Sequence, residues 1–189
     1  IVDYIKEKHS TQVRQTGEPL FTHPVAVAYS LASWGLDQTS VEAALLHEVP
    51  EMTGTSIEEI KTLFGEECAK IVDGVTRVGQ VKLRGSRDEE FLENLRKMFV
   101  AMAQDIRVVI IRLADRLHNI STLDGVPLSK QKRIAVETLE VYAPLADRLG
   151  MGKLKGDLED NSFPFVYPEE YQWIVSVAKP HFKYSEENI

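Results

Sequence analysis

Apolar residues recur every three or four positions along almost the whole chain. Two successive stretches show this most clearly: Ile57, Ile60, Leu63 and Phe64, then Cys68, Ile71, Val72 and Val75. This period is typical of an amphipathic α-helix, whereas a half-buried strand alternates apolar and polar positions. No alternating run of convincing length occurs. The sequence therefore predicts an all-α fold, a helical bundle around a single core.

Capping and turn residues indicate where the helices begin and end. Thr39-Ser40-Val41-Glu42 and Thr55-Ser56-Ile57-Glu58 both have the capping-box pattern, so each predicts a helix start. Pro50 predicts the end of the first of these helices, because proline has no backbone N–H to donate. Further helices are expected over 88–104, over 105–123 and, with a bend at Pro144, over 129–149.

The helical pattern weakens after residue 152. We expect one helical domain over residues 1–152, and a C-terminal helical extension over 153–189 that Pro164, Pro168 and Pro180 divide into shorter pieces. The chain of 189 residues is long enough to bury a full core. It begins with Ile1 instead of Met, so we expect it to be a fragment of a longer protein.

The formal net charge of −7 argues against a general attraction for DNA or for an anionic membrane. A polyanionic ligand would need a local basic pocket, for which the loop with Lys82, Arg84 and Arg87 is a candidate, although a solvated surface loop explains it equally well. The single cysteine, Cys68, excludes an internal disulfide and favours a reducing cytoplasm. No apolar run reaches membrane-spanning length.

Candidate chemistry gathers in three places. His47 and Glu48 follow an apolar helix and precede Pro50 and Glu51, His23 precedes a proline, and Asp115 lies in the most apolar helix. Two histidines and two carboxylates suit Zn, Mn or Fe, and the spacing does not select among them. Each residue also has a simpler interpretation: His23 as a turn residue, and Asp115 as an ion-pair partner of Arg112 or Arg116.

One polar stripe runs along the helix that carries Asp115. Its members are separated by three or four residues: Arg112, Asp115, Asn119 and Thr122. A mid-helix acid among apolar residues needs water or a partner, so we interpret the stripe as lining a pocket. We assign His9 and His118 to the core or the surface, with no chemical role.

Longer strings resemble a known family. They are Arg14 to Pro24, Asp73 to Thr76, Glu93 to Met98, Asp105 to Asn119, and Glu137 to Gly150. His23, His47-Glu48 and Asp115 fall in order at the H…HD…D signature of HD-domain metal phosphohydrolases. Over roughly residues 4 to 175, the chain resembles the hydrolase domain of RelA/SpoT homologues, the enzymes of guanosine tetra- and pentaphosphate, written (p)ppGpp.

The resemblance implies a manganese-dependent (p)ppGpp 3′-pyrophosphohydrolase of the stringent response, although another divalent metal is possible. By position, the implied metal ligands are His23, His47, Glu48 and Asp115. Glu51 would assist acid/base catalysis. Arg14, Asn119 and Thr122 would bind the guanine nucleotide. Members of the family usually continue into a domain that synthesises (p)ppGpp, so an attached synthetase domain is the expected partner.

Three residues depart from the family pattern. Glu48 replaces the signature aspartate, Met52 replaces the second acid of a pair with Glu51, and Gln15 replaces a lysine. A thioether cannot accept a proton at neutral pH, and loss of a general acid/base typically costs roughly 10²–10⁴ in rate. We therefore expect slowed or altered hydrolysis. The alternative is a catalytically weakened domain that regulates the attached synthetase, and a third possibility is an HD hydrolase of another nucleotide.

Overall fold

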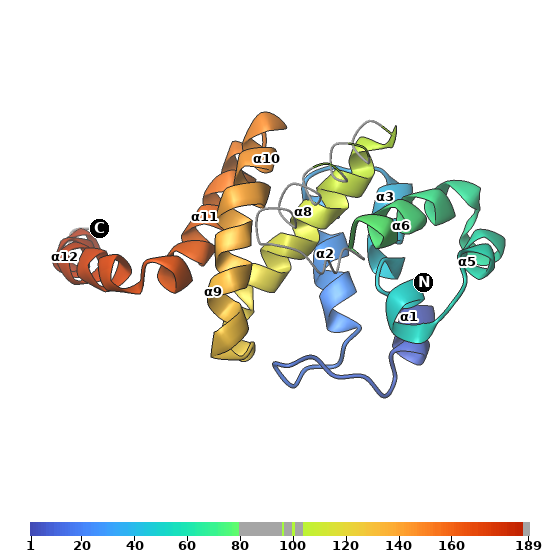
Figure 1. The fold of residues 1–189 in the computed structure, drawn as a ribbon, viewed down its shortest axis with the longest axis horizontal. Helices are drawn as coiled ribbons and strands as arrows, with labels where there is room; N and C mark the ends of the chain where they lie inside the picture. The colour runs from blue at the N-terminus through green and yellow to red at the C-terminus, as the bar shows by residue number, and fades with distance from the viewer. Residues whose placement is uncertain (80–95, 97–99, 101–103, 187–189) are drawn as a thin grey trace. The chain divides into compact units, whose positions relative to one another are not determined.

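The computed structural model describes residues 1–79, 96, 100 and 104–186. The basic loop with Lys82, Arg84 and Arg87, and nearly all of the helix expected over 88–104, lie outside the described residues. Within the described ranges every regular element is a helix, apart from an isolated antiparallel bridge between Val13 and Pro19 (Figure 1). The prediction of an all-α fold is confirmed. None of the described helices has the length and apolar character that crossing a membrane requires.

The chain divides into two compact units, Ile1–Asn119 and Ile120–Ile189. This division follows the density of packing contacts within the chain. The boundary expected after residue 152 is a different one, because it separates the predicted functional domain from its C-terminal extension. That boundary stays a prediction.

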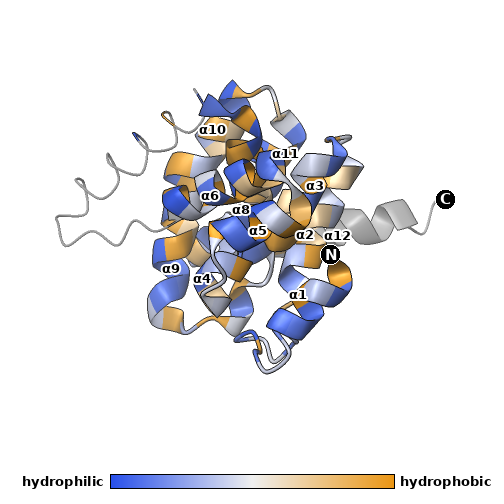
Figure 2. Cartoon of the chain, turned by 90° about the vertical axis from the view of Figure 1, so that its right-hand side faces the viewer, coloured by the Kyte–Doolittle hydropathy of each residue, from blue (hydrophilic) through white to orange (hydrophobic). Residues whose placement is uncertain are grey.

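The first unit contains six helices and most of a seventh among its described residues. They are α1 (Val2–Lys8), α2 (Thr22–Ser33), α3 (Gln38–Leu46), α4 (Val49–Thr53), α5 (Ile57–Phe64), α6 (Glu66–Gly79) and α8 (Ile106–Ser121). Helix α3 packs against α2 and α6, and α6 packs against α5. The core contains fully buried side chains from these helices: Leu31, Leu46, Ile60, Ile71, Ile111 and Leu113. Figure 2 shows hydrophobic and hydrophilic residues interspersed along the same helices, as amphipathic packing requires.

Helix α8 lies close against α6. A Cβ atom added at Gly74 of α6 would lie 2.7 Å from Cγ2 of Val108, a buried residue in the first turn of α8. Glycine at this position therefore permits the close approach of the two helices. The first turn of α8 is also held by Arg107, whose Nη1 lies 2.8 Å from Oε1 of Glu67 on α6. These contacts fix the helix that carries Asp115.

Helices begin close to both places where the capping-box patterns predict them, at Gln38 and at Ile57, but Thr39 and Thr55 do not cap them. Asp37 caps α3, because its carboxylate accepts hydrogen bonds from the backbone N–H and the hydroxyl of Ser40, at 3.0 and 2.8 Å. Ser56 caps α5 and accepts from the N–H of Glu59 at 3.1 Å. A short polar side chain in extended backbone can satisfy these N–H groups, so the nearest suitable residue caps the helix.

The second unit contains η1 (Leu123–Gly125), α9 (Leu128–Glu137), η2 (Thr138–Tyr142), α10 (Ala143–Arg148), α11 (Gly152–Val166) and α12 (Pro168–Glu186). Helix α11 packs against α9 and α10. The long helix expected over 129–149 runs without a gap through α9, η2 and α10, and its irregularity is the π-helical turn η2, which ends two residues before Pro144. Of the divisions expected after residue 153, the one at Pro168 is confirmed, because α12 begins there. The divisions at Pro164 and Pro180 are wrong, because α11 continues through the first and α12 through the second.

Candidate metal centre

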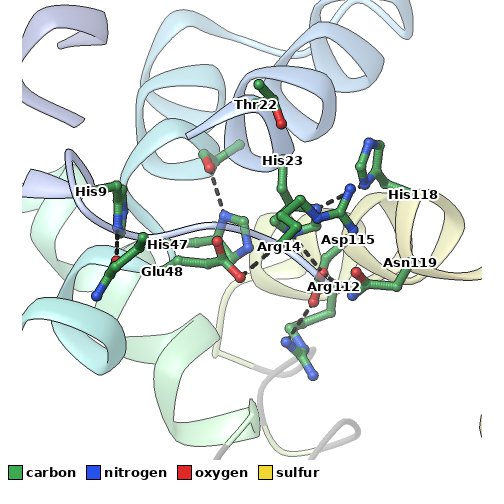
Figure 3. A network of polar contacts seen from close by, with 12 residues as sticks. His9, Arg14, Thr22, His23, His47, Glu48, Arg112, Asp115, His118 and Asn119 are labelled. Carbon is green, nitrogen blue, oxygen red and sulfur yellow. Dashed lines mark hydrogen bonds and ion pairs between the residues drawn. The ribbon is translucent and has the colours of Figure 1, made fainter. Parts of the chain in front are cut away.

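Four predicted site residues of the first unit come together from separate elements (Figure 3). His23 is the second residue of α2, His47 and Glu48 join α3 to α4, and Asp115 lies in the middle of α8. His23, His47 and Asp115 are buried, whereas the side chain of Glu48 is 24% exposed. The donors therefore converge from one helix start, one helix junction and one helix interior.

The junction between α3 and α4 differs from the expectation that the helix with His47 runs to Pro50. Helix α3 ends at Leu46, and Pro50 is the second residue of α4. Proline is well tolerated there, because the N–H that it lacks has no intrahelical partner in the first turn. Glu51 therefore lies on a different helix from the one that leads to His47, so the two do not share a helix face. Glu51 and Met52 are exposed on α4.

The distances between the donor atoms fit a metal site. Nε2 of His23 lies 3.2 Å from Oδ1 of Asp115 and 3.7 Å from Oε1 of Glu48. One ligand atom each from His23, His47 and Glu48 lie within 4.8 Å of one another. Nε2 of His23 and Oε2 of Glu48 are buried without a hydrogen-bond partner. Buried polar atoms are normally satisfied, so these two fit a group that binds lone pairs, which is what a cation does.

The ring of His47 is oriented for binding through Nε2. Its Nδ1 lies 2.7 Å from the carbonyl oxygen of Ala44, one turn earlier, and donates to it. Such a bond to the second ring nitrogen is the usual way that a protein fixes a ligand histidine. Burial lowers the pKa of His47 to about 4. The ring is therefore neutral at pH 7, with the lone pair on Nε2.

Asp115 is held by its neighbours on α8. Nη1 of Arg112 lies 2.7 Å from Oδ2, and Nδ2 of Asn119 donates to Oδ1 at 2.6 Å. Burial alone would raise the pKa of the carboxyl, but Arg112 and the rings of His23 and His47 outweigh burial and hold that pKa well below its usual range. The ion pair with Arg112 does not exclude a metal, because a carboxylate can accept about four interactions.

Glu48 has less support. Burial raises its pKa, and the charge of Asp115 adds to that effect, while His23 and Arg14 oppose it. No hydrogen bond involving its carboxylate is found within the described ranges. Its contact with His23 spans 3.7 Å, which is longer than a hydrogen bond.

Arg14 lies beside this cluster, and its side chain is 12% exposed (Figure 3). Burial is the main cause that lowers the pKa of His118 to about 4, and the charge of Arg14 adds to it. The same charge opposes the rise in the pKa of Glu48. Gln15, the next residue, is exposed. Thr122 belongs to the second unit, so its contribution to the site stays a prediction.

His118 also contacts the cluster, although no role was predicted for it. Its Nδ1 lies 2.9 Å from Nδ1 of His23, and the two ring centroids are 4.8 Å apart. A signal was present, because His118 follows Asp115 by three residues and so lies on the same face of α8.

Comparisons with known proteins agree with this geometry. The family model described as the HD domain matches residues 2–152. The chain therefore belongs to the HD-domain family, and the resemblance to the RelA/SpoT hydrolase domain is confirmed by its relatives. HD domains bind a divalent metal, which the cluster of His23, His47 and Glu48 fits.

Two curated relatives and one solved structure illustrate the relationship. A guanosine-3′,5′-bis(diphosphate) 3′-pyrophosphohydrolase of Aquifex aeolicus is 47% identical over 98% of this chain, which covers 26% of the relative. The bifunctional (p)ppGpp synthase/hydrolase SpoT of Escherichia coli K12 is 46% identical over 92% of this chain and 25% of its own. A metazoan SpoT orthologue described as hydrolysing ppGpp is 26% identical with a TM-score of 0.65, over 86% of this chain and 90% of its own. This chain thus spans about a quarter of the length of these curated relatives.

Proposed function

We propose that the chain is the hydrolase domain of a (p)ppGpp 3′-pyrophosphohydrolase, which releases pyrophosphate from the 3′ position and leaves GDP or GTP. The observation that carries this proposal is the convergence of His23, Glu48 and Asp115, whose donor atoms approach within 3.2 and 3.7 Å. The names of the relatives from A. aeolicus and E. coli support the substrate class.

The metal is Mn²⁺ in this proposal, and its ligands are His23, His47, Glu48 and Asp115. In such a site a divalent cation supplies activation of water and neutralises the negative charge that develops on the departing diphosphate. Neutral His47 offers Nε2, and the lowered pKa of Asp115 keeps its carboxylate ionised at pH 7.

The remaining residues act on the substrate and on protons. Exposed Glu51 takes a proton from the attacking water as general base. The guanidinium of Arg14 binds phosphate oxygens with two parallel hydrogen bonds and offsets charge in the transition state. Asn119, which already donates to Asp115, and Thr122 bind the nucleotide. Glu48 and Met52 slow the reaction, because one carboxylate of the acid/base pair is missing and the longer ligand side chain shifts its oxygen.

Metal content followed by turnover tests the proposal. The purified chain is expected to bind about one Mn²⁺ and, with Mn²⁺ added, to release GDP and pyrophosphate from ppGpp. His23→Ala is the control, because it removes the ring that faces both carboxylates. A chain that binds no divalent metal contradicts the proposal. Metal-dependent turnover of other nucleotides, but not of ppGpp, would show that the proposed substrate is wrong.

The second candidate function is a weakened HD domain that regulates an attached (p)ppGpp synthetase. The changes at Glu48, Met52 and Gln15 favour it, as does the E. coli relative, whose name includes a synthase and which is about four times as long. Glu48→Asp combined with Met52→Asp separates the two. A gain in hydrolysis of roughly 10²-fold or more would identify these positions as the limit on catalysis, and no gain would favour regulation. A cytoplasmic location stays a prediction that rests on the single cysteine.

A further inference from the structure

The two imidazole rings of His23 and His118 share one hydrogen bond. Their Nδ1 atoms are 2.9 Å apart, and the rings are inclined at 60°. A bond between two neutral imidazoles needs one N–H and one lone pair, so one ring donates and the other accepts. Which ring donates decides the state of the second nitrogen of His23, Nε2, because a neutral imidazole carries a single proton.

Metal binding through Nε2 requires donation by His23. If His118 donated, the proton of His23 would be on Nε2, 3.2 Å from Oδ1 of Asp115, and no lone pair would remain there for a cation. If His23 donates, Nε2 carries a lone pair that faces Glu48 and Asp115, and a cation satisfies the lone pair and the carboxylates together.

We propose that His118 is a positioning residue for the metal centre. Its Nδ1 accepts a hydrogen bond from the Nδ1–H of His23. This bond fixes the tautomer and the ring orientation that leave Nε2 of His23 open to a divalent cation. For His47 a backbone carbonyl, that of Ala44, has this role. The inference rests on the proposed function only in that His23 is a metal ligand.

Metal affinity separates His118 from a residue that merely fills space. His118→Leu keeps an apolar side chain but removes the acceptor, and His118→Asn offers an amide oxygen near the place of Nδ1. Titration calorimetry of the metal-free proteins with Mn²⁺ is expected to give a Kd raised 10- to 100-fold in the Leu variant. The Asn variant is expected to recover most of this loss. Thermal unfolding of the metal-free proteins checks that all three chains fold alike.

The position of the shared proton gives a readout that does not depend on turnover. In protein with ¹⁵N-labelled histidine and bound Zn²⁺, a diamagnetic substitute for Mn²⁺, a coupling across the N–H···N bond is expected between the two Nδ1 nuclei, with the directly bonded proton on His23. A proton on Nδ1 of His118 overturns the inference, and so does equal Mn²⁺ affinity of the unsubstituted chain and the Leu variant. A chain that binds metal with His118 as the acceptor but does not hydrolyse ppGpp would contradict the proposed function alone, whereas a chain that binds neither metal contradicts both.

Discussion

Asp115 and Glu48 approach the same nitrogen of His23, but the chain holds these two carboxylates in different ways. Asp115 lies in the interior of α8, where Arg112 and Asn119, three residues before and four after it, each bond to one of its oxygens. Glu48 lies at the break between α3 and α4, and its Oε2 is buried without a hydrogen-bond partner. One carboxylate is fixed by its own helix, and the other is placed by a junction.

Two of the three departures from the family pattern fall on the side with less support, since Glu48 lies at the junction and Met52 in the short helix α4 that follows it. The α8 side has Asp115 and Asn119 where the pattern expects them, and the third departure, Gln15, belongs to neither region. A junction between helices lacks the continuous i→i−4 hydrogen-bond ladder of a helix interior. An extra methylene can therefore be accommodated there with less disturbance than at Asp115. Substitution is tolerated at the part of the site with the fewest fixed contacts.

The largest expected effect on stability comes from removing the carboxylate of Asp115 on α8. Asp115→Ala leaves Arg112 buried to four-fifths without its carboxylate, which is expected to lower the free energy of unfolding by about 3–5 kcal/mol. Urea denaturation of the metal-free protein measures it. The matched variant Glu48→Ala removes a carboxylate whose pKa burial raises, so it is expected to cost little or to stabilise. Similar losses in the two variants would contradict the comparison.

A smaller effect concerns the contact that holds α8 against α6. Gly74→Ala places a methyl group 2.7 Å from Cγ2 of Val108, and overpacking of this kind costs about 1–3 kcal/mol. The loss is measured as a shift of the urea midpoint. In a Val108→Ala background the same substitution is expected to stabilise by up to about 1 kcal/mol, because alanine favours the helix. An equal cost in both backgrounds would show that the close approach is not the cause.

The smallest effect concerns the hydrogen bond from Gln12 to α4, the helix that follows the junction. Oε1 of Gln12 accepts from Nδ1 of His9 at 2.7 Å, and Nε2 of Gln12 donates to the carbonyl oxygen of Met52 at 2.9 Å. Gln12→Ala is expected to cost about 1 kcal/mol of unfolding free energy. Gln15→Ala, at an exposed neighbouring position, serves as the control and should leave the urea midpoint unchanged. Equal effects would mean that Gln12 does not anchor α4.

The sequence predicted the α8 side better than the junction. On a helix, spacing alone determines which residues share a face, so the pairing of Arg112, Asp115 and Asn119 followed from positions three and four apart. The same rule includes His118, to which the sequence alone assigned no chemical role. Its significance depends on His23, which lies 95 residues away. No local pattern contains that contact.

The junction was predicted poorly for a local reason. Pro50 both ends a preceding helix and begins a new one well, and the sequence does not distinguish these two roles. In the structure the second role applies: α3 ends at Leu46, before the proline, and Pro50 lies in the first turn of α4. The caps shifted for a similar reason, since Asp37 and Ser56 compete with nearby threonines for the same N–H groups. The long motifs identified the family despite these local errors, because they depend on many residues at once.

The thiol of Cys68 is protected from chemical modification in the folded chain. It is the single cysteine, it is 1% exposed in α6, and burial raises its pKa to about 11. Thiol reagents attack the thiolate, so the native protein presents almost no reactive sulfur at neutral pH. Alkylation of this side chain reports the opening of the helix around it. A second cysteine, introduced on exposed α4, would then be labelled selectively without first removing the natural one.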